Sequence, residues 1–305
     1  MKKNNILFFL CLCSAMGAAA QNWPEVKPEA RPGSRWWWLG SAVDKDNLNY
    51  NLKEYGKAGL GSLEVTPIYG VKGNESHNLC FLSPEWMEMF RYTQEVGKTN
   101  GIDIDMNTGT GWPFGGPEVS LSQAAAKAIF ECYEVKGGEP VKLEINIRDP
   151  KEQKQRDVAY LDCLIAYGTD GKVVNLTKKV KDGYLQWDAP AGDWQLVALF
   201  VGRTFQKVKR AAPGGEGYVM DHFSPVSVKS YFEKFDKAFK TNKGNFPRTF
   251  FNDSYEVYGA DWTPAFLKEF AARRGYRLEN HFPEFISQER TELTRRLVSD
   301  YRETL

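Results

Sequence analysis

The stretch RWWWLG, residues 35–40, is a continuous apolar run that ends in glycine. A run of this kind is typical of a strand that is buried on both faces of a parallel sheet. Asp44 can then cap a helix, because Leu48, Leu52 and Tyr55 recur at the spacing of one helix face. The stretch is therefore predicted to begin a fold in which a strand is followed directly by a helix.

The same order of elements repeats downstream. GSLEVTPIYG, residues 61–70, predicts a second strand. Residues 83–101 predict a second helix, with Ser83 as its cap and Pro84 in its first turn. IDIDMN, residues 102–107, predicts a third strand. Strands and helices that alternate with short connections are typical of parallel β-α-β units.

The alternation stops after a short helix expected near residues 123–128. Residues 129–210 contain β-rich segments separated by Gly, Asp and Pro, with Thr169-Asp170-Gly171 as the clearest hairpin signal. This part is predicted to be an inserted antiparallel module. The α/β pattern then resumes with a strand near Met220, a helix that begins at Ser224, a strand near Phe251 and a helix capped at Thr263.

Five strands of the parallel type can be counted in all, near Trp37, Val65, Ile104, Met220 and Phe251. A closed (β/α)8 barrel needs eight strands, and the final residues YRETL still have a helical pattern. The sequence therefore predicts an α/β fold, a (β/α)8 TIM-type barrel that is incomplete in this chain. The predicted parts are barrel in residues 21–128, the inserted module in 129–210 and barrel again in 211–305, truncated before closure.

The first 20 residues have the three parts of a secretory signal peptide: two lysines, an apolar run and small residues before Gln21. The apolar run is too short to span a bilayer permanently. We therefore expect a secreted protein, in the periplasm or at the cell surface of a Gram-negative bacterium, with no membrane span after the signal is removed.

The charge balance bears on the partner. With 40 basic and 39 acidic side chains, the chain lacks the excess charge of a nucleic-acid or acidic-lipid binder. A neutral ligand fits better. The high aromatic content of 14% favours sugars, whose apolar faces pack on rings, although most rings are expected in the core.

Histidines and cysteines give no metal signal. His77, His222 and His281 are scattered, and no cysteine pair has metal-ligand spacing. The predicted mature chain keeps Cys80, Cys132 and Cys163, which allows one disulfide within the chain at most. We expect three buried free thiols, with a Cys132–Cys163 bridge as the alternative.

Polar side chains follow the predicted strands where each strand ends. In parallel α/β folds the active site lies at the carboxyl ends of the strands. Each of these residues could equally be a helix cap or an ion pair, but their recurrence favours a shared site. They are Glu64 and Tyr69, then Asp105, Asn107 and Trp112, then Asp221 and His222, and last Asp253 and Glu256.

The loop NTGTGWPFGGP, residues 107–117, resembles a phosphate-binding loop only in part. The third glycine of that motif is missing, and Trp-Pro-Phe occupies the turn. A nucleotide site is therefore not expected. The loop is predicted to present Trp112 and Phe114 to a ring-shaped ligand, with a purely structural turn as the alternative.

Six segments in this order resemble the N-terminal catalytic part of the α-L-rhamnosidases of glycoside hydrolase family 106. The resemblance covers most of the chain after residue 20, and the inserted module is its vaguest part. The segments are RPGSRWWWLG, LEVTPIYG, LSPEWMEMFRYT, MNTGTGWPFGGP, GYVMDHFS and FFNDSYEVYGADWTPAFLKEF.

The resemblance implies a large, secreted, multidomain enzyme built on a (β/α)8 barrel. It also implies inversion at the anomeric carbon and a calcium ion, whose ligands this sequence does not identify. The family's Asp-x-x-Glu motif corresponds to Asp253 and Glu256. The second catalytic glutamate is expected downstream of Leu305, so this chain is expected to be the N-terminal part of a longer protein and inactive alone.

Glycoside cleavage needs one carboxyl group that protonates the leaving oxygen, and a buried aromatic setting raises the pKa of such an acid. Glu256 is predicted to be this acid, and Asp253 to orient it or bind sugar hydroxyls. Trp112, Asn107, Glu64, Asp221 and His222 are the candidate substrate-binding residues. The predicted substrate is a plant or bacterial glycan with terminal α-L-rhamnose. The alternatives are another barrel-type exo-glycosidase, or a carbohydrate-binding protein without catalysis.

Overall fold

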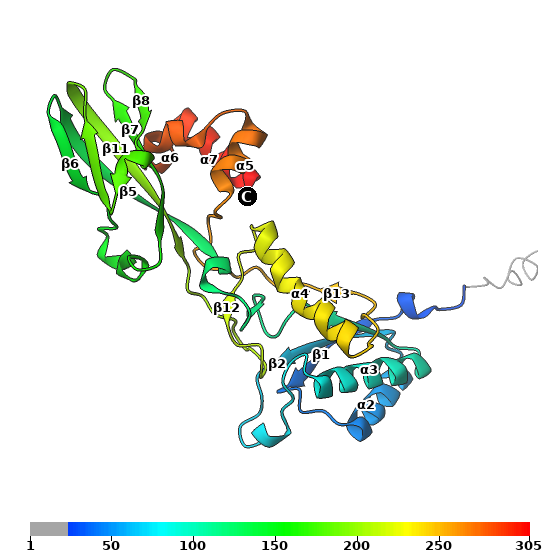
Figure 1. Ribbon diagram of the computed structural model, residues 1–305. Coiled ribbons are helices and arrows are strands. Elements are labelled where there is room, and N and C mark those ends of the chain that lie inside the picture. The colour runs from blue at the N-terminus through cyan, green and yellow to red at the C-terminus, as the bar shows by residue number, and fades with distance from the viewer. Residues whose placement is uncertain (1–23) are drawn as a thin grey trace, which may run out of the picture.

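The computed structural model describes residues 24–305, so the predicted signal peptide lies outside the described residues. The chain forms an elongated molecule with a parallel sheet at one end and antiparallel sheets at the other (Figure 1). No helix in residues 24–305 has the length and apolar character needed to cross a bilayer.

A parallel sheet with helices on one face forms the first part. Its strand order is β1 (Gly33–Leu39), β2 (Ser62–Ile68), β3 (Asp103–Asn107) and β13 (Phe250–Phe251). Helices α2 (Lys45–Lys57), α3 (Pro84–Thr99) and α4 (Pro225–Thr241) contribute to the same apolar core. The predicted caps Asp44 and Ser83 are confirmed, because each side chain accepts a backbone N–H of the first turn. Ser224, where a helix was predicted to begin, caps α4 in the same way.

The strand RWWWLG is buried on one face only, which corrects the prediction of two-sided burial. Trp38 is 1% exposed and packs on Trp86 at 5.6 Å between ring centroids. Trp37 and Leu39 point to the other face and are each 42% exposed. The apolar run looked two-sided because the outward positions carry an aromatic ring and a leucine instead of polar residues.

The sheet has four parallel strands and not the five that were predicted. The segment near Met220 instead forms β12 (Tyr218–Val219), which pairs antiparallel with β4 (Gly115–Gly116). Glycine makes this pairing possible, since a Cβ on Gly115 would lie 2.1 Å from the carbonyl oxygen of Tyr218. Among residues 24–305, β1 and β13 remain open edges, so a closed barrel is not formed by these strands.

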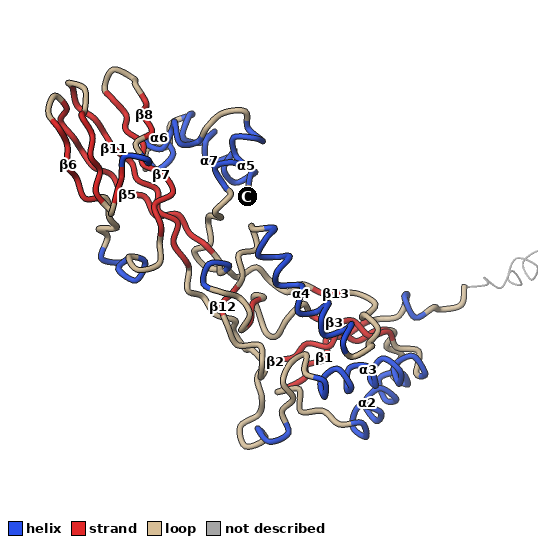
Figure 2. The backbone as a smooth tube through the Cα atoms, viewed as in Figure 1, coloured by secondary structure: helices blue, strands red, loops and turns tan. Residues whose placement is uncertain are grey.

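The second part is a sandwich of two antiparallel sheets, seen as red strands beside β6 and β11 in Figure 2. One sheet has the order β5 (Ala126–Gly137), β11 (Gly192–Arg203), β7 (Tyr160–Gly168) and β8 (Val173–Asn175). The other has β6 (Pro140–Glu144), β10 (Tyr184–Asp188) and β9 (Val180–Lys181). Gly171, at φ +80°, turns the predicted hairpin between β7 and β8.

The helix predicted near residues 123–128 is absent. A 3₁₀ turn, η3 (Leu121–Gln123), precedes β5, which already pairs with β11 at Ala126. Partners far away in sequence decide this pairing, so local spacing did not reveal it. Five other 3₁₀ turns are described: η1 (Pro28–Ala30), η2 (Glu75–His77), η4 (Pro150–Gln155), η5 (Thr177–Lys179) and η6 (Leu278–His281).

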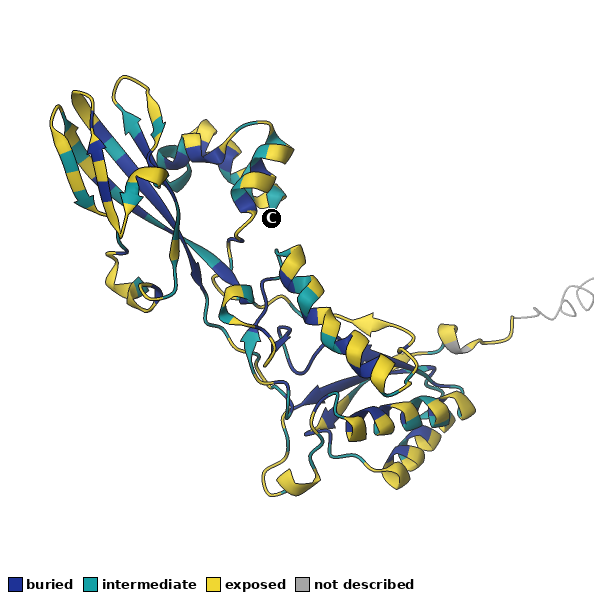
Figure 3. Cartoon of the chain, viewed as in Figure 1, coloured by how far each residue is buried: buried dark blue, intermediate teal, exposed yellow. Residues whose placement is uncertain are grey.

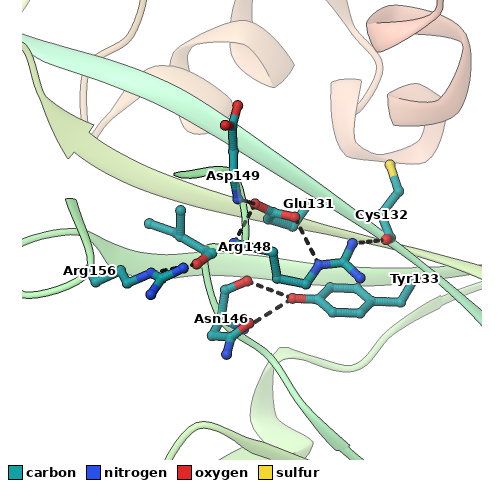
Figure 4. A network of polar contacts seen from close by, with 8 residues as sticks. Glu131, Cys132, Tyr133, Asn146, Arg148, Asp149 and Arg156 are labelled. Atoms are coloured by element: carbon teal, nitrogen blue, oxygen red, sulfur yellow. Dashed lines mark hydrogen bonds and ion pairs between the residues drawn. The ribbon is translucent and has the colours of Figure 1, made fainter. Parts of the chain in front are cut away.

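A buried carboxylate ties the loop after β6 to strand β5 (Figure 4). Glu131, 7% exposed, accepts the backbone N–H of Arg148 at 2.8 Å and pairs with its Nε at 3.1 Å. The guanidinium also lies over the Tyr133 ring, 4.2 Å from its centroid. Every oxygen of this carboxylate is therefore engaged within the sandwich.

The last helices cover the outer face of the β5–β11–β7 sheet. They are α5 (Phe266–Arg274), α6 (Phe282–Ile286) and α7 (Glu292–Thr304). Phe270, Phe282 and Leu297 share a buried cluster with Val197 and Leu199 of β11. The segment therefore packs on the sandwich, as Figure 1 shows, although its sequence was interpreted as a continuation of the barrel.

The predicted cap at Thr263 is wrong. Helix α5 begins at Phe266 without a side-chain cap, and the Thr263 hydroxyl instead donates to Asp221 Oδ2 at 2.8 Å.

The cysteines also differ from expectation. All three are free, but Cys80 is exposed, Cys132 is half-buried and only Cys163 is buried. Cys132 and Cys163 lie on strands that flank β11 on opposite sides. Two strand spacings are about 9.5 Å, which is more than a disulfide can bridge.

Candidate functional site

The sheet face opposite the helices carries a row of charged side chains. Strand register places Arg35 beside Glu64 and Glu64 beside Asp105, so the three side chains share this face. Each is the third residue of its strand, so Glu64 and Asp105 lie inside the strands and not at the strand ends where they were predicted.

Arg35 joins two of the predicted site residues. Its Nε lies 3.1 Å from Glu64 Oε1, and its Nη1 donates to Asp253 Oδ2 at 2.8 Å. Its guanidinium also lies over the rings of Trp37 and Phe251, 5.2 and 4.8 Å from their centroids. One cation therefore holds two carboxylates together between aromatic rings.

Burial raises the pKa of Glu64 above its usual value. A hydrogen bond from Thr66 Oγ1 at 2.8 Å and the charge of Arg35 act against this shift. Desolvation is the largest cause, so the carboxyl of Glu64 binds a proton more readily than an exposed glutamate does.

Asp105 has a structural role. Arg248 binds both of its oxygens, at 3.0 and 2.5 Å, and the backbone N–H of Thr249 donates to it at 3.1 Å. The hydrogen bond to Asp105 raises the pKa of Arg248. Asp105 thus fastens the chain that enters β13 to β3.

The loop of residues 107–117 is fixed by backbone contacts near its middle. The N–H of Gly111 donates to Pro67 O at 3.0 Å, and Trp112 exchanges backbone bonds of 3.1 and 2.9 Å with Lys209. The half-buried Trp112 ring lies 6.4 Å from that of Trp37. Phe114 is 8% exposed and belongs to the core, so the prediction that it faces a ligand is wrong.

Asn107 is buried at the end of β3. Its Nδ2 donates to Gly111 O at 3.3 Å, while its Oδ1 has no partner among the described residues. An unpaired buried oxygen is costly, so this amide is available to a ligand that reaches the loop.

Asp221 does not join the row of Arg35. It is 2% exposed and accepts from Thr263 Oγ1 at 2.8 Å and from the N–H of Phe223 at 3.0 Å. Burial raises its pKa. Its carboxylate therefore stabilises the turn after β12, and the prediction that it binds substrate has no support from this geometry.

His222 does reach the segment that carries the Asp-x-x-Glu motif. Its ring centroid lies 5.0 Å from that of Tyr255, and burial lowers the pKa of its imidazole. Its Nδ1 has no partner within residues 24–305. Tyr255 is held in turn by Asn252, whose Nδ2 donates to the phenol oxygen at 2.7 Å.

Glu256 is exposed, in contrast to the predicted apolar setting. Its one described side-chain contact is a long hydrogen bond of 3.5 Å from Tyr258 OH. The strand before it, β13, is only two residues long, and both of these residues are exposed. Glu256 therefore follows a segment that is not buried in the core. Asp253 and Glu256 thus differ: the first is fixed by Arg35, and the second is free to meet a ligand.

No group of three or more His, Cys, Asp or Glu side chains in residues 24–305 is arranged to hold a metal ion. Glu64 and Asp253 are paired with Arg35. The described residues therefore do not by themselves fit calcium.

Sequence comparison adds the family. The profile of glycoside hydrolase family 106, described as alpha-L-rhamnosidase, matches residues 24–171 and 165–305. The chain belongs to glycoside hydrolase family 106. A protein of Formosa agariphila, named as a candidate beta-glucuronidase, is 26% identical over 321 residues, which cover 91% of this chain and 27% of that protein.

A solved structure shares the fold. The rhamnosidase from Novosphingobium sp. PP1Y aligns with a TM-score of 0.73 and 16% identity, over 92% of this chain and 44% of that one. This family 106 chain thus spans less than half the length of either relative.

Arg35 and Trp37 were not among the residues predicted to form the site. The sequence did contain a hint of this role, because Arg35 begins an otherwise apolar run. In a strand it lies on the same face as Trp37 and Leu39. Its partner Asp253 lies 218 residues away in sequence, which no local pattern reports.

Proposed function

We propose that this family 106 protein is an exported glycoside hydrolase that removes terminal α-L-rhamnose from glycans with inversion. The main support for this proposal is that the chain belongs to family 106. In this chain Arg35 pairs with Glu64 and Asp253 and lies over the ring of Trp37. Carboxylates next to exposed rings suit a sugar, which offers hydroxyls at its edge and C–H groups on its faces.

Glu256 acts as the acid in this proposal. Its carboxyl proton passes to the glycosidic oxygen while the bond from that oxygen to the anomeric carbon breaks, and the electron pair leaves with the oxygen. Water adds to the anomeric carbon from the opposite side and gives its proton to a second carboxylate. We expect that base downstream of Leu305. Asp253, fixed by Arg35, would bind sugar hydroxyls, as would Asn107 through its unpaired Oδ1.

The same proposal places the parallel strands in a (β/α)8 barrel completed by a longer chain. The strand order β1-β2-β3-β13 supports this, because successive strands of such a barrel are neighbours. Export rests on the signal-like first 20 residues alone.

Calcium is proposed only for the longer protein, with ligands from outside these residues. Activity should then fall after exhaustive chelation and return when calcium is added back. Full activity in a protein shown by metal analysis to hold no calcium would remove the ion from the proposal.

A second candidate is β-glucuronide hydrolysis, which the name of the Formosa relative favours.

The deciding experiment assays the full-length protein on chromogenic α-L-rhamnoside, β-glucuronide and a panel of other glycosides. Turnover of the rhamnoside, with release of β-L-rhamnose first by NMR, supports the proposal. Turnover of the glucuronide alone supports the second candidate. Glycan binding without turnover of any glycoside would indicate a binding protein.

A further inference from the structure

Gln206 lies in the segment that connects β11 to β12. It is not one of the residues assigned to the proposed site. Its side-chain amide makes two short hydrogen bonds to the backbone on either side of one loop residue. Nε2 donates to Glu256 O at 2.7 Å, and Oε1 accepts from the N–H of Tyr258 at 2.8 Å. A primary amide matches this pair of backbone groups because it carries a donor and an acceptor side by side.

The backbone of Gln206 is itself held in place. Its carbonyl accepts from the N–H of Val219 in β12 at 3.0 Å. Three residues further on, Lys209 pairs with Trp112 and lies over the Tyr258 ring, 4.6 Å from its centroid. One short segment therefore supports both the Trp112 loop and the Glu256 loop.

Glu256 depends on this support more than Asp253 does. The Asp253 carboxylate has its own ion pair with Arg35, whereas the Glu256 carboxylate has a single contact of 3.5 Å among the described residues. The direction in which Glu256 points is thus set by its backbone, and the described side chain that binds this backbone is Gln206.

We propose that Gln206 is a positioning residue, which aims the Glu256 carboxyl at the leaving oxygen by holding the backbone at residues 256 and 258. The inference rests on the proposed function, in which Glu256 is the acid. It links the end of the antiparallel module to the reacting group, although Gln206 touches no reacting atom.

The test uses the full-length protein and two aryl α-L-rhamnosides. Dinitrophenolate leaves without a proton, whereas methoxyphenolate needs one. Gln206→Ala is expected to lower kcat on the methoxyphenyl substrate about 10–100-fold, as small misplacement of a reacting group does. The KM and the dinitrophenyl turnover should change little. Gln206→Glu should show the same selectivity, because a carboxylate oxygen would face the Glu256 carbonyl.

Gln94→Ala is the matched control. Gln94 also binds a backbone carbonyl, that of Phe246 at 3.1 Å, on the other side of the sheet from this site. The Gln94→Ala variant should leave turnover of both substrates unchanged. In a Glu256→Gln background, Gln206→Ala should add no further loss, since residues that act as a unit are not additive.

Three results would overturn the inference. Equal losses on both substrates, or losses that add fully to those of Glu256→Gln, would mean that Gln206 only supports the fold. Wild-type turnover of the methoxyphenyl substrate by Glu256→Gln would remove the acid, and with it this role. That last outcome is measured on Glu256→Gln alone, without any change at Gln206. Failure of the proposed function can therefore be distinguished from failure of the Gln206 role.

Discussion

The two sheets that are covered by helices use their faces differently. In the sandwich, β11 packs against the second sheet on one face and against α5–α7 on the other, so residues 194 and 196–203 are buried. In the parallel sheet, α2–α4 cover one face, and the other holds Arg35, Trp37 and Glu64 within reach of solvent. Figure 3 colours both sheets and their helices by burial. Cover on both faces, by a sheet and by helices, gives stability, whereas the face left open carries the candidate chemistry.

Glu256→Gln in the full-length protein should give the largest effect on activity. The amide cannot donate the proton, and general acid catalysis is worth about 10²–10⁴-fold. Turnover of a substrate with a poor leaving group should fall by that factor, while thermal unfolding stays as in the parent. Glu139→Gln, at an exposed turn of the sandwich, is the control and should lose nothing. A parent-like rate for Glu256→Gln would refute its assignment as the acid.

Leu199→Ala and Leu39→Ala compare the covered and the open face directly. Leu199 is 0% exposed and Leu39 is 42% exposed. Removing the buried side chain leaves a cavity and should lower the free energy of unfolding by about 2–5 kcal/mol. The exposed one should cost less than about 0.5 kcal/mol. Denaturant unfolding of the two variants decides this, and equal losses would mean that another part of the protein covers Leu39.

Local signals explain what the sequence predicted well. The caps Asp44 and Ser83 and the helix start at Ser224 were correct because a cap binds its own helix within three residues. Thr263, followed by proline, has the same local pattern, but its hydroxyl is taken by Asp221, 42 residues earlier. A competing long-range partner therefore displaced the expected cap.

Pairing between distant segments explains what was missed. Met220 lies in a segment with strand composition, yet the glycines at 115 and 116 draw that segment into an antiparallel pair. Trp37 and Trp38 are neighbours of the same type, and only the helices packed behind Trp38 distinguish them. The residues of the Asp-x-x-Glu motif were found from family resemblance. Arg35, which holds Asp253, became visible only when β1 and the chain after β13 were brought together.

Arg35→Met and Arg148→Met form the last comparison, and the smallest expected effect. Both arginines pair with a glutamate at 3.1 Å through Nε and lie over an aromatic ring. Methionine keeps the apolar stem but removes the charge, so in the first variant Glu64 and Asp253 lose their cation and repel each other. A partly exposed pair is worth about 1 kcal/mol, which predicts a roughly fivefold fall in kcat/KM. Arg148→Met should keep full turnover, because Glu131 retains its backbone donors within the sandwich. Kinetics on the rhamnoside together with thermal unfolding separate the two. If both variants lost activity equally, the loss would reflect a lower overall stability. The Arg35 ion pairs would then have no specific role in activity.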